Sequence, residues 1–155
     1  MAVTSAGLLL YRYSDGVLEV LLVHPGGPFW TNRDLGAWSI PKGETEKGEE
    51  LLAAAHREFC EETGSSVEGF SFALGQLRQR SGKVVYAWAV ESNFDPGRLH
   101  SNFFEMEWPR GSGQTREFPE IDRAAWFDIA EARKRILPGQ AGFLDALINR
   151  LETSP

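Results

Sequence analysis

Short apolar stretches separated by glycine, proline and polar residues run through much of the chain, which is the pattern of β-strands joined by turns. Stretches with this composition are residues 4–13, 17–23, 38–40, 70–80, 84–90, 103–108 and 124–127. Ser14-Asp15-Gly16 and Ser81-Gly82-Lys83 each separate two neighbouring stretches and therefore predict two β-hairpins. Residues 24–37 are rich in glycine, proline and aromatic side chains, and we expect them to form a loop, as we do for residues 109–119.

Helical periodicity marks three other segments, residues 47–63, 129–136 and 141–151. In the first, an apolar stripe is predicted to face the core and consists of Leu51, Leu52, Ala55 and Phe59. Gly64 follows as the expected C-cap of that helix. The order of strands, helix, strands and helices predicts a mixed sheet packed between helices, in an α/β (α+β) fold.

Length and composition fit one soluble domain over residues 1–155, with 42% hydrophobic and 25% charged residues. No apolar run approaches the ~20 residues of a membrane-spanning helix, and no basic residue precedes the first apolar run. Cys60 is the only cysteine, so the chain can form neither an internal disulfide nor a cysteine-based zinc cluster. We therefore expect a cytoplasmic protein without a membrane partner, and a buried, inert Cys60 within the helix.

The formal charge is −6, from 16 lysine and arginine residues against 22 acids, which disfavours a general nucleic-acid surface. A protein with this balance would need local basic groups or a metal ion in order to hold anionic phosphates. The histidines have no metal-ligand spacing, and a structural or surface position is expected for each of them.

Three glutamates, Glu58, Glu61 and Glu62, lie at i, i+3 and i+4 and therefore share one face of the predicted helix. They repel one another in its last turn, where the helix dipole already disfavours negative charge. A divalent cation would reverse that balance, because carboxylate oxygens are suitable ligands for Mg²⁺ or Mn²⁺. The alternative is a solvated acidic face in which Arg57 pairs with Glu61.

The segment around these glutamates resembles the Nudix box, G-x5-E-x7-R-E-U-x-E-E-x-G-U, in which U is a bulky apolar residue. The matching positions are Gly43, Glu49, Arg57, Glu58, Phe59, Glu61, Glu62 and Gly64. Ser65 departs from the final U, and we expect Val67 to take over its packing role. Residues 24–30, 36–43 and 118–122 extend the resemblance to a bacterial branch of predicted NTP pyrophosphohydrolases, which is similar to diadenosine tetraphosphate hydrolases. The resemblance implies an α/β/α sandwich.

Nudix enzymes hydrolyse a nucleoside diphosphate linked to another group, so the resemblance implies attack of water on a phosphoanhydride with the help of Mg²⁺ or Mn²⁺. It implies Glu58 and Glu62 as direct metal ligands and Glu61 as the third, with the carbonyl of Lys42 or Gly43 completing the shell. Arg57 would orient a glutamate, and Glu49 would support the segment by charge pairing. The implied partner is a small nucleotide, first a dinucleoside polyphosphate such as Ap4A and second a nucleoside triphosphate, rather than a nucleic-acid polymer.

The general base is open at this stage, because family members take it from different elements. Glu120, on the loop before the last short strand, is the candidate from outside the box, and an ordinary loop carboxylate is the alternative. Glu105 and Glu107 are rivals that share one face of an extended segment. A metal-bridging hydroxide would need no dedicated base.

Substrate contacts are expected from basic and aromatic side chains, namely Lys42, Arg33, Arg78, Trp30, Tyr86 and Trp88. Lys42 is favoured for the phosphates because it precedes Gly43, whereas Arg80 and Lys83 fit an exposed, charged edge. Tyr86 and Trp88 share a strand face and could stack on a base, with core packing as the alternative. Trp30 is expected to act as a lid or stacking residue.

Two other functional classes are compatible with the sequence. One is a non-catalytic nucleotide-binding or regulatory module on the same fold, against which the retained Glu58, Glu61 and Glu62 argue. The other is a protein–protein interaction domain that uses the aromatic loop. The sequence leaves the choice between a monomer and a homodimer open.

Overall fold

A six-stranded mixed sheet forms the centre of the protein in a computed structural model that describes residues 3–153. Its strands are β1 (Thr4–Ser14), β2 (Val17–Pro25), β3 (Lys42–Glu44), β4 (Ser71–Arg78), β5 (Val84–Glu91) and β8 (Ile121–Asp128). They are arranged in the order β4-β5-β1-β2-β8, with β3 paired to β1. Only the β1–β5 pair is parallel among these pairings, so the predicted mixed sheet is confirmed.

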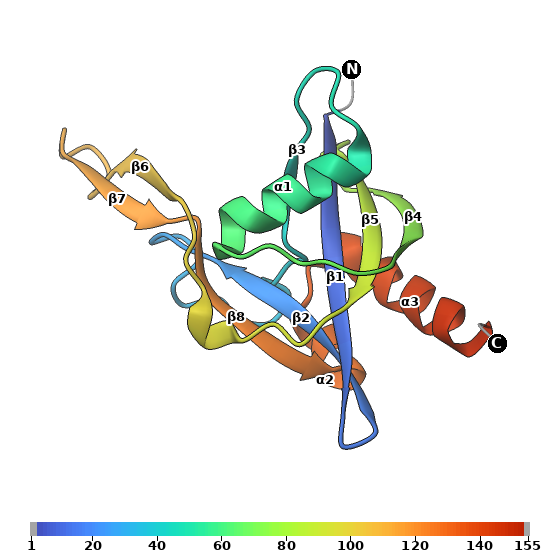
Figure 1. Cartoon of the computed structure of the whole chain (residues 1–155). Coiled ribbons are helices and arrows are strands. Elements are labelled where there is room, and N and C mark those ends of the chain that lie inside the picture. Colours follow the sequence, from blue (N-terminus) through green and yellow to red (C-terminus); the bar gives the residue numbers. More distant parts are fainter. Residues whose placement is uncertain (1–2, 154–155) are drawn as a thin grey trace.

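Helices cover both faces of the sheet, as Figure 1 shows. Helix α1 (Leu51–Thr63) lies over one face, and α2 (Ile129–Arg135) and α3 (Ala141–Thr153) lie over the other. Strand β1 alternates between the two layers: Leu8 and Leu10 pack with the α1 cluster and Leu9 packs with the α2–α3 cluster. All three leucines are fully buried, and each contributes about 1.5–3 kcal/mol by leaving water. The α/β/α sandwich is therefore confirmed.

Strand β1 exchanges one neighbour for another along its length. Its first part, from Ser5 to Gly7, pairs with β3, and its last part, from Tyr11 to Ser14, pairs with β2. A Cβ at Gly7 would lie 2.6 Å from the Cβ of Lys42, so the close approach of β3 requires glycine there.

Residues 38–40 form only isolated bridges, Val23 to Ser39 and Trp38 to Ile136, rather than the predicted strand. The regular strand, β3, begins immediately after Pro41 instead. Pro41 lacks an N–H, but its carbonyl accepts the N–H of Leu8 at 3.1 Å and so leads the chain onto β1.

Helix α1 begins at Leu51, four residues later than predicted, because the chain turns at Gly48 with φ of 79°. Its end agrees with the prediction: Gly64 has φ of 78° and donates its N–H to the carbonyl of Cys60. Leu51 and Leu52 are only partly buried, whereas Ala54, Ala55, Phe59 and Thr63 form the buried face. Val67 packs against the cluster beneath α1, as expected because Ser65 stands where the Nudix box has an apolar residue.

Cys60 is exposed on α1, which corrects the expectation of a buried thiol. The helix faces the sheet through Ala55 and Phe59, and Cys60 projects to the solvent side. None of the helices within residues 3–153 is long and apolar enough to cross a membrane.

A separate two-stranded sheet extends from one side of the molecule (Figure 1). It consists of β6 (Phe103–Glu107) and β7 (Thr115–Pro119), so the expectation that residues 109–119 form only a loop is wrong for their second half. The side chains of Thr115, Arg116 and Glu117 are exposed and give no apolar signal. Backbone pairing with β6 maintains the strand, and this pairing depends on a partner that periodicity cannot identify.

Candidate active site

Arg57 organises the acidic end of helix α1. Its Nε and Nη2 donate to the two carboxylate oxygens of Glu49 at 2.7 and 2.9 Å, a bidentate pair. Its Nη1 donates to Glu58 at 2.8 Å and to Glu61 at 3.2 Å. The guanidinium lowers the pKa of Glu49 to about 2, and the Glu49 hydrogen bonds raise the pKa of Arg57. Arg57 therefore fixes three carboxylates, and the expected support from Glu49 is present.

Glu62 is held separately from this network. Its Oε1 accepts the backbone N–H of Lys42 at 3.1 Å, at the start of β3. The pKa of Glu62 is raised to about 8, chiefly by burial and also by the charges of Glu58 and Glu120, although the hydrogen bond and charge of Lys42 oppose the shift. Without a cation beside it, Glu62 therefore retains its proton at neutral pH.

Glu58 lies directly against the backbone of Gly43. A Cβ at position 43 would overlap the Glu58 carboxylate, so the absence of a side chain creates the space that this carboxylate fills. Burial and then the charge of Glu61 raise the pKa of Glu58, although Arg57 opposes the shift. Burial, followed by the charge of Glu61, likewise raises the pKa of Glu120. The carboxyl groups thus form one coupled acidic centre.

A Gly43→Ala substitution should displace Glu58 while leaving the fold intact, because the added methyl meets the mobile end of a side chain. We expect a loss of about 10–100-fold in Mn²⁺ affinity, the usual cost of misplacing a group that supports a metal site. Calorimetry with MnCl₂ measures this loss, and circular dichroism checks the fold. Gly97→Ala, whose methyl meets only the side chain of Asp95, is the control and should bind Mn²⁺ like the unmodified protein. Equal affinity in both variants would contradict the assigned role of Gly43.

A cavity of about 200 Å³ opens beside the acidic centre, with β2, β3 and the end of α1 among its walls. Its walls are Val23, Pro25, Trp30, Ala37, Ser39, Lys42, Glu62, Glu120, Ile121 and Leu137. Lys42, Glu62, Glu120 and Trp30 were expected from the sequence at the site, and the fold brings all four to one cavity. Burial and then the charge of Lys83 lower the pKa of Lys42, whereas Glu62 and Glu58 support its ammonium form when they are ionised.

The oxygen-rich centre has the chemistry of a divalent-cation site, since carboxylates that raise one another's pKa gain most from a neighbouring cation. Within residues 3–153, however, the carboxylates do not already surround one metal position as a group of three. Arg57 draws Glu58 and Glu61 to itself, and Glu62 turns to the N–H of Lys42. Small side-chain rotations would therefore accompany binding of a cation.

Glu120 precedes β8, as the sequence predicted, but the connection that carries it is a single residue between β7 and β8. Its N–H donates to the carbonyl of Asn102 at 2.8 Å, and its carbonyl accepts the N–H of Gly26 at 2.9 Å. The N–H of Asn102 in turn donates to the carbonyl of Glu61 at 3.0 Å. This chain of backbone hydrogen bonds fixes Glu120 relative to the end of α1.

The two rival bases lie elsewhere. Glu105 is exposed on β6, opposite Glu117 of β7. The carboxylate of Glu107 accepts the N–H groups of Gly111 and Gly113, and so stabilises the turn between the two strands. Neither rival lines the cavity.

The structure places the remaining predicted substrate residues outside the cavity walls. Trp88 packs with the core cluster beneath α1, so it takes the core position that was the alternative to stacking on a base. Tyr86 is half-buried on the same strand, Arg78 is exposed at the end of β4, and the Arg33 guanidinium stacks over Trp30 at 5.5 Å. Trp30 both lines the cavity and packs against the core, so it is less free than expected of a lid.

His24 connects the loop that carries Trp30 to β8, a role that the sequence did not reveal. The imidazole is fully buried, with Nδ1 2.8 Å from Asp122 Oδ1 and Nε2 2.6 Å from the carbonyl of Arg33. Because a carbonyl accepts only, Nε2 carries a proton and donates to it. The expectation of a structural position for this histidine is confirmed.

Leu137 and Gln140 were also missed. Leu137 completes the cavity wall after α2, where its N–H donates to the carbonyl of Trp38 at 2.7 Å. Gln140 is fully buried: its Oε1 accepts the N–H of Ile40 and its Nε2 donates to Ser39 Oγ, both at 3.0 Å. Both residues belong to a segment with no catalytic motif, so only the tertiary contacts reveal them.

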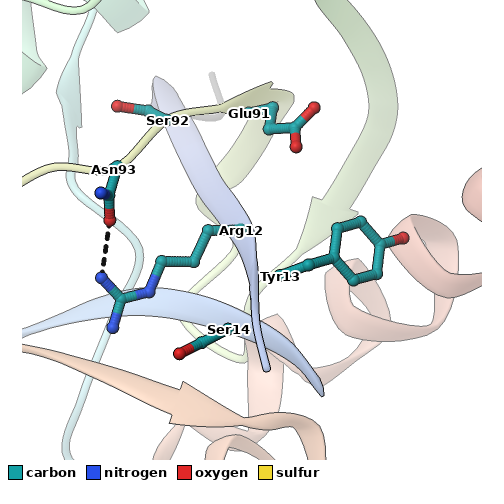
Figure 2. A pocket seen from close by; sticks show the side chains of 6 residues that line it. All are labelled: Arg12, Tyr13, Ser14, Glu91, Ser92 and Asn93. Atoms are coloured by element: carbon teal, nitrogen blue, oxygen red, sulfur yellow. Dashed lines mark hydrogen bonds between the residues drawn. The ribbon is translucent and has the colours of Figure 1, made fainter. Parts of the chain in front are cut away.

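A larger hollow of about 450 Å³ lies at the far end of β1 and carries none of this chemistry (Figure 2). Its only basic side chain, Arg12, is already paired with Glu19 and Asn93, at 2.8 Å each, and stacks over Trp126. The site is therefore assigned to the smaller cavity, where the acidic centre lies.

Comparison with known proteins shows the family of the chain. The sequence model of the NUDIX domain matches residues 1–147. An RNA pyrophosphohydrolase of Caulobacter vibrioides is 29% identical over 145 residues, covering 83% of this chain and 80% of that protein. An asymmetrical bis(5′-nucleosyl)-tetraphosphatase of Mus musculus is 29% identical over 103 residues, covering 59% of this chain and 66% of that protein.

Solved structures share the fold. A C. elegans Ap4A hydrolase in a binary complex superposes with a TM-score of 0.66 at 21% identity, covering 99% of this chain and 100% of that one. The NUDIX domain of Shewanella oneidensis NrtR, complexed with ADP ribose, gives a TM-score of 0.66 at 18% identity, covering 97% and 89%. At these identities the likeness concerns the architecture of the chain.

Proposed function

The chain belongs to the Nudix family, and from that premise we propose that it is a Mg²⁺- or Mn²⁺-dependent hydrolase of a phosphoanhydride in a nucleoside diphosphate linked to a further group. The observation that carries the proposal is the position of Glu62, Glu120 and Lys42 around one cavity at the acidic end of α1. A dinucleoside polyphosphate such as Ap4A is the first substrate and a nucleoside triphosphate the second.

Glu58, Glu61 and Glu62 would hold the cation, with the carbonyl of Lys42 or Gly43 as a further oxygen ligand. A divalent cation supplies charge neutralisation at the phosphates and a lower pKa for bound water. Arg57 acts through the glutamates by keeping Glu58 and Glu61 oriented. The Lys42 ammonium, at the cavity wall, binds a phosphate oxygen of the substrate.

Glu120 is the proposed general base. It lies on the cavity wall with Glu62, and its raised pKa favours acceptance of a proton from the attacking water. Its backbone bonds to Gly26 and Asn102 hold it in place during that transfer. Trp30, on the same wall, is the side chain available for stacking on a base.

The proposal is tested by incubating the protein with Ap4A and MgCl₂ and separating the products by chromatography. We expect ATP and AMP as products, and no turnover when EDTA replaces the metal. A panel that includes nucleoside triphosphates and nucleotide sugars extends the test. If the protein hydrolysed no member of the panel, with Mg²⁺ or with Mn²⁺, the proposed activity would be contradicted.

A triphosphorylated RNA 5′ end is a second candidate substrate, favoured by the similarity to the Caulobacter RNA pyrophosphohydrolase over 83% of the chain. The chemistry at the anhydride is the same, so only the substrate beyond it differs. The charge of −6 argues against a long RNA interface but permits contact with one or two terminal nucleotides. Release of pyrophosphate from a 5′-triphosphorylated oligonucleotide distinguishes this candidate.

A further inference from the structure

The site cavity is too small for the whole substrate that the proposed function requires. Its volume is about 200 Å³, whereas pockets for small-molecule ligands and cofactors usually measure about 300–1,000 Å³. With the anhydride beside Glu62 and Lys42, the rest of the substrate must therefore extend out of the cavity. A second hollow begins at the same wall, because Leu137 lines both.

This second hollow, which we call the Arg80 groove, has a volume of about 600 Å³. It lies between the turn that joins β4 to β5 and the 3-10 helix η2 (Pro138–Gln140). Its lining is Gln79, Arg80, Ser81, Leu137, Pro138 and Gly139. One wall, formed by Leu137, Pro138 and Gly139, is thus apolar, and the other carries a guanidinium, an amide and a hydroxyl. A nucleotide presents the same two surfaces, an apolar base face and a polar sugar-phosphate.

The charge of the groove is positive although the whole protein is negative. The turn contributes Arg80, with Arg78 and Lys83 beside it, and no acidic residue occurs between Glu68 and Glu91. Among residues 3–153, Arg80 has no ion-pair partner, so its guanidinium is available to an anion. Lys83 Nζ lies 3.7 Å from the carboxylate of Glu44, at the end of the strand β3 that begins with Lys42, and this ion pair places the basic turn beside the strand that carries the cavity wall.

Hydrogen bonds fix the walls of the Arg80 groove relative to the site cavity. Buried Gln140 in η2 bonds to Ile40 and Ser39, and Ser39 lines the site cavity. On the other side, the N–H of Gln79 donates to the carbonyl of Lys83 at 2.7 Å and closes the turn. Neither wall therefore has to be ordered when a ligand binds, which lowers the entropic cost of binding.

We propose that the Arg80 groove binds a second nucleotide unit of the substrate, with Arg80 pairing with a phosphate and Leu137 and Pro138 packing against the base. The inference rests on the proposed function, since it places the anhydride in the neighbouring cavity. The second unit is either the distal nucleotide of a dinucleoside polyphosphate or the second nucleotide of a 5′-triphosphorylated oligonucleotide. The groove thus selects substrates that continue beyond one nucleotide.

The test compares long and short substrates in a charge-reversal variant, Arg80→Glu. We measure KM and kcat with Ap4A, with a 5′-triphosphorylated dinucleotide and with ATP. We expect KM to rise at least about fivefold for one or both long substrates, the value of one exposed ion pair, and less than about twofold for ATP. The long substrate that responds identifies the source of the second unit. Arg116→Glu, on β7 at the opposite side of the molecule (Figure 1), is the charge-matched control and should leave all three KM values unchanged.

A second variant, Gly139→Phe, fills the groove without changing charge. The backbone at Gly139 accepts a side chain, because a Cβ there meets its nearest neighbour, Gln79, at an ordinary 3.5 Å. We expect the same selective rise in KM for the long substrate. One contrary outcome is that the unmodified protein hydrolyses the panel while both variants raise KM equally for long and short substrates, or raise it for neither. In that case the groove proposal is wrong and the proposed function stands. If the unmodified protein hydrolyses none, the proposed function fails, and the groove proposal with it.

Discussion

Glu62→Gln is expected to lower kcat by roughly 10²–10³-fold, in the range seen when one charge-stabilising group is removed from an active site. The amide is nearly isosteric and can still accept the N–H of Lys42, so the contact between α1 and β3 persists. What is lost is the negative charge that a divalent cation needs at this position. Steady-state hydrolysis of Ap4A at saturating Mg²⁺ measures the effect.

The control for this variant is Glu105→Gln, which removes one carboxylate from the exposed face of β6. With Mg²⁺ bound, both variants remove one negative charge, so a non-specific charge effect would appear in both. We expect Glu105→Gln to retain full kcat and Glu62→Gln to keep the circular dichroism spectrum of the unmodified protein. Full activity in a correctly folded Glu62→Gln protein would refute the assignment of Glu62 as a ligand.

Without divalent cations, the protein should lose stability as the pH rises from about 5 to 8. Burial raises the pKa of Glu62 from the ordinary 4.5 to about 8 in the folded protein. Between these values the folded state retains a proton that the unfolded chain releases, so the free energy of unfolding falls with increasing pH. At 1.36 kcal/mol per pKa unit the loss is on the order of 4 kcal/mol, which corresponds to roughly 10 °C in melting temperature. The pKa values of Glu58 and Glu120 are raised too and act in the same direction.

Thermal melts in EDTA across this pH range, repeated with MgCl₂, measure this loss. We expect Mg²⁺ to stabilise most at pH 8, because the cation replaces the proton that the carboxyl groups otherwise need. Glu62→Gln in EDTA should lose much less stability between pH 5 and 8, since its amide does not titrate. A melting temperature that is independent of pH in the metal-free protein would show that Glu62 is not desolvated as described.

The residues of the acidic helix could be identified from the sequence because the chemistry there is local. Spacing along one helix determines that Glu58, Glu61 and Glu62 lie near one another and that Arg57 can reach Glu61. Gly64 ends the helix because glycine accepts a left-handed backbone, and this too is a local property. The order of strands and helices likewise followed from local periodicity.

The predictions that failed depend on contacts between distant segments. Strand β7 has exposed side chains, so nothing but its pairing with β6 distinguishes it from a loop. The directions in which the carboxylates point also depend on such contacts: Glu49 reaches Arg57 from the preceding loop, and Glu62 accepts the N–H of Lys42 from β3. Spacing alone therefore gives the members of the acidic centre but not its arrangement.

The sequence by itself determined the mixed sheet packed between helices, through local periodicity, and the box residues and the family, through the resemblance of one continuous segment to the Nudix box. Only the tertiary structure decided which residues share a cavity. The backbone of Glu120 is tied by way of Asn102 to Glu61 at the end of α1, and Leu137 lines both the cavity and the Arg80 groove. These relations join residues that are up to about a hundred positions apart, such as Ser39 and Gln140, and long-range packing alone specifies them.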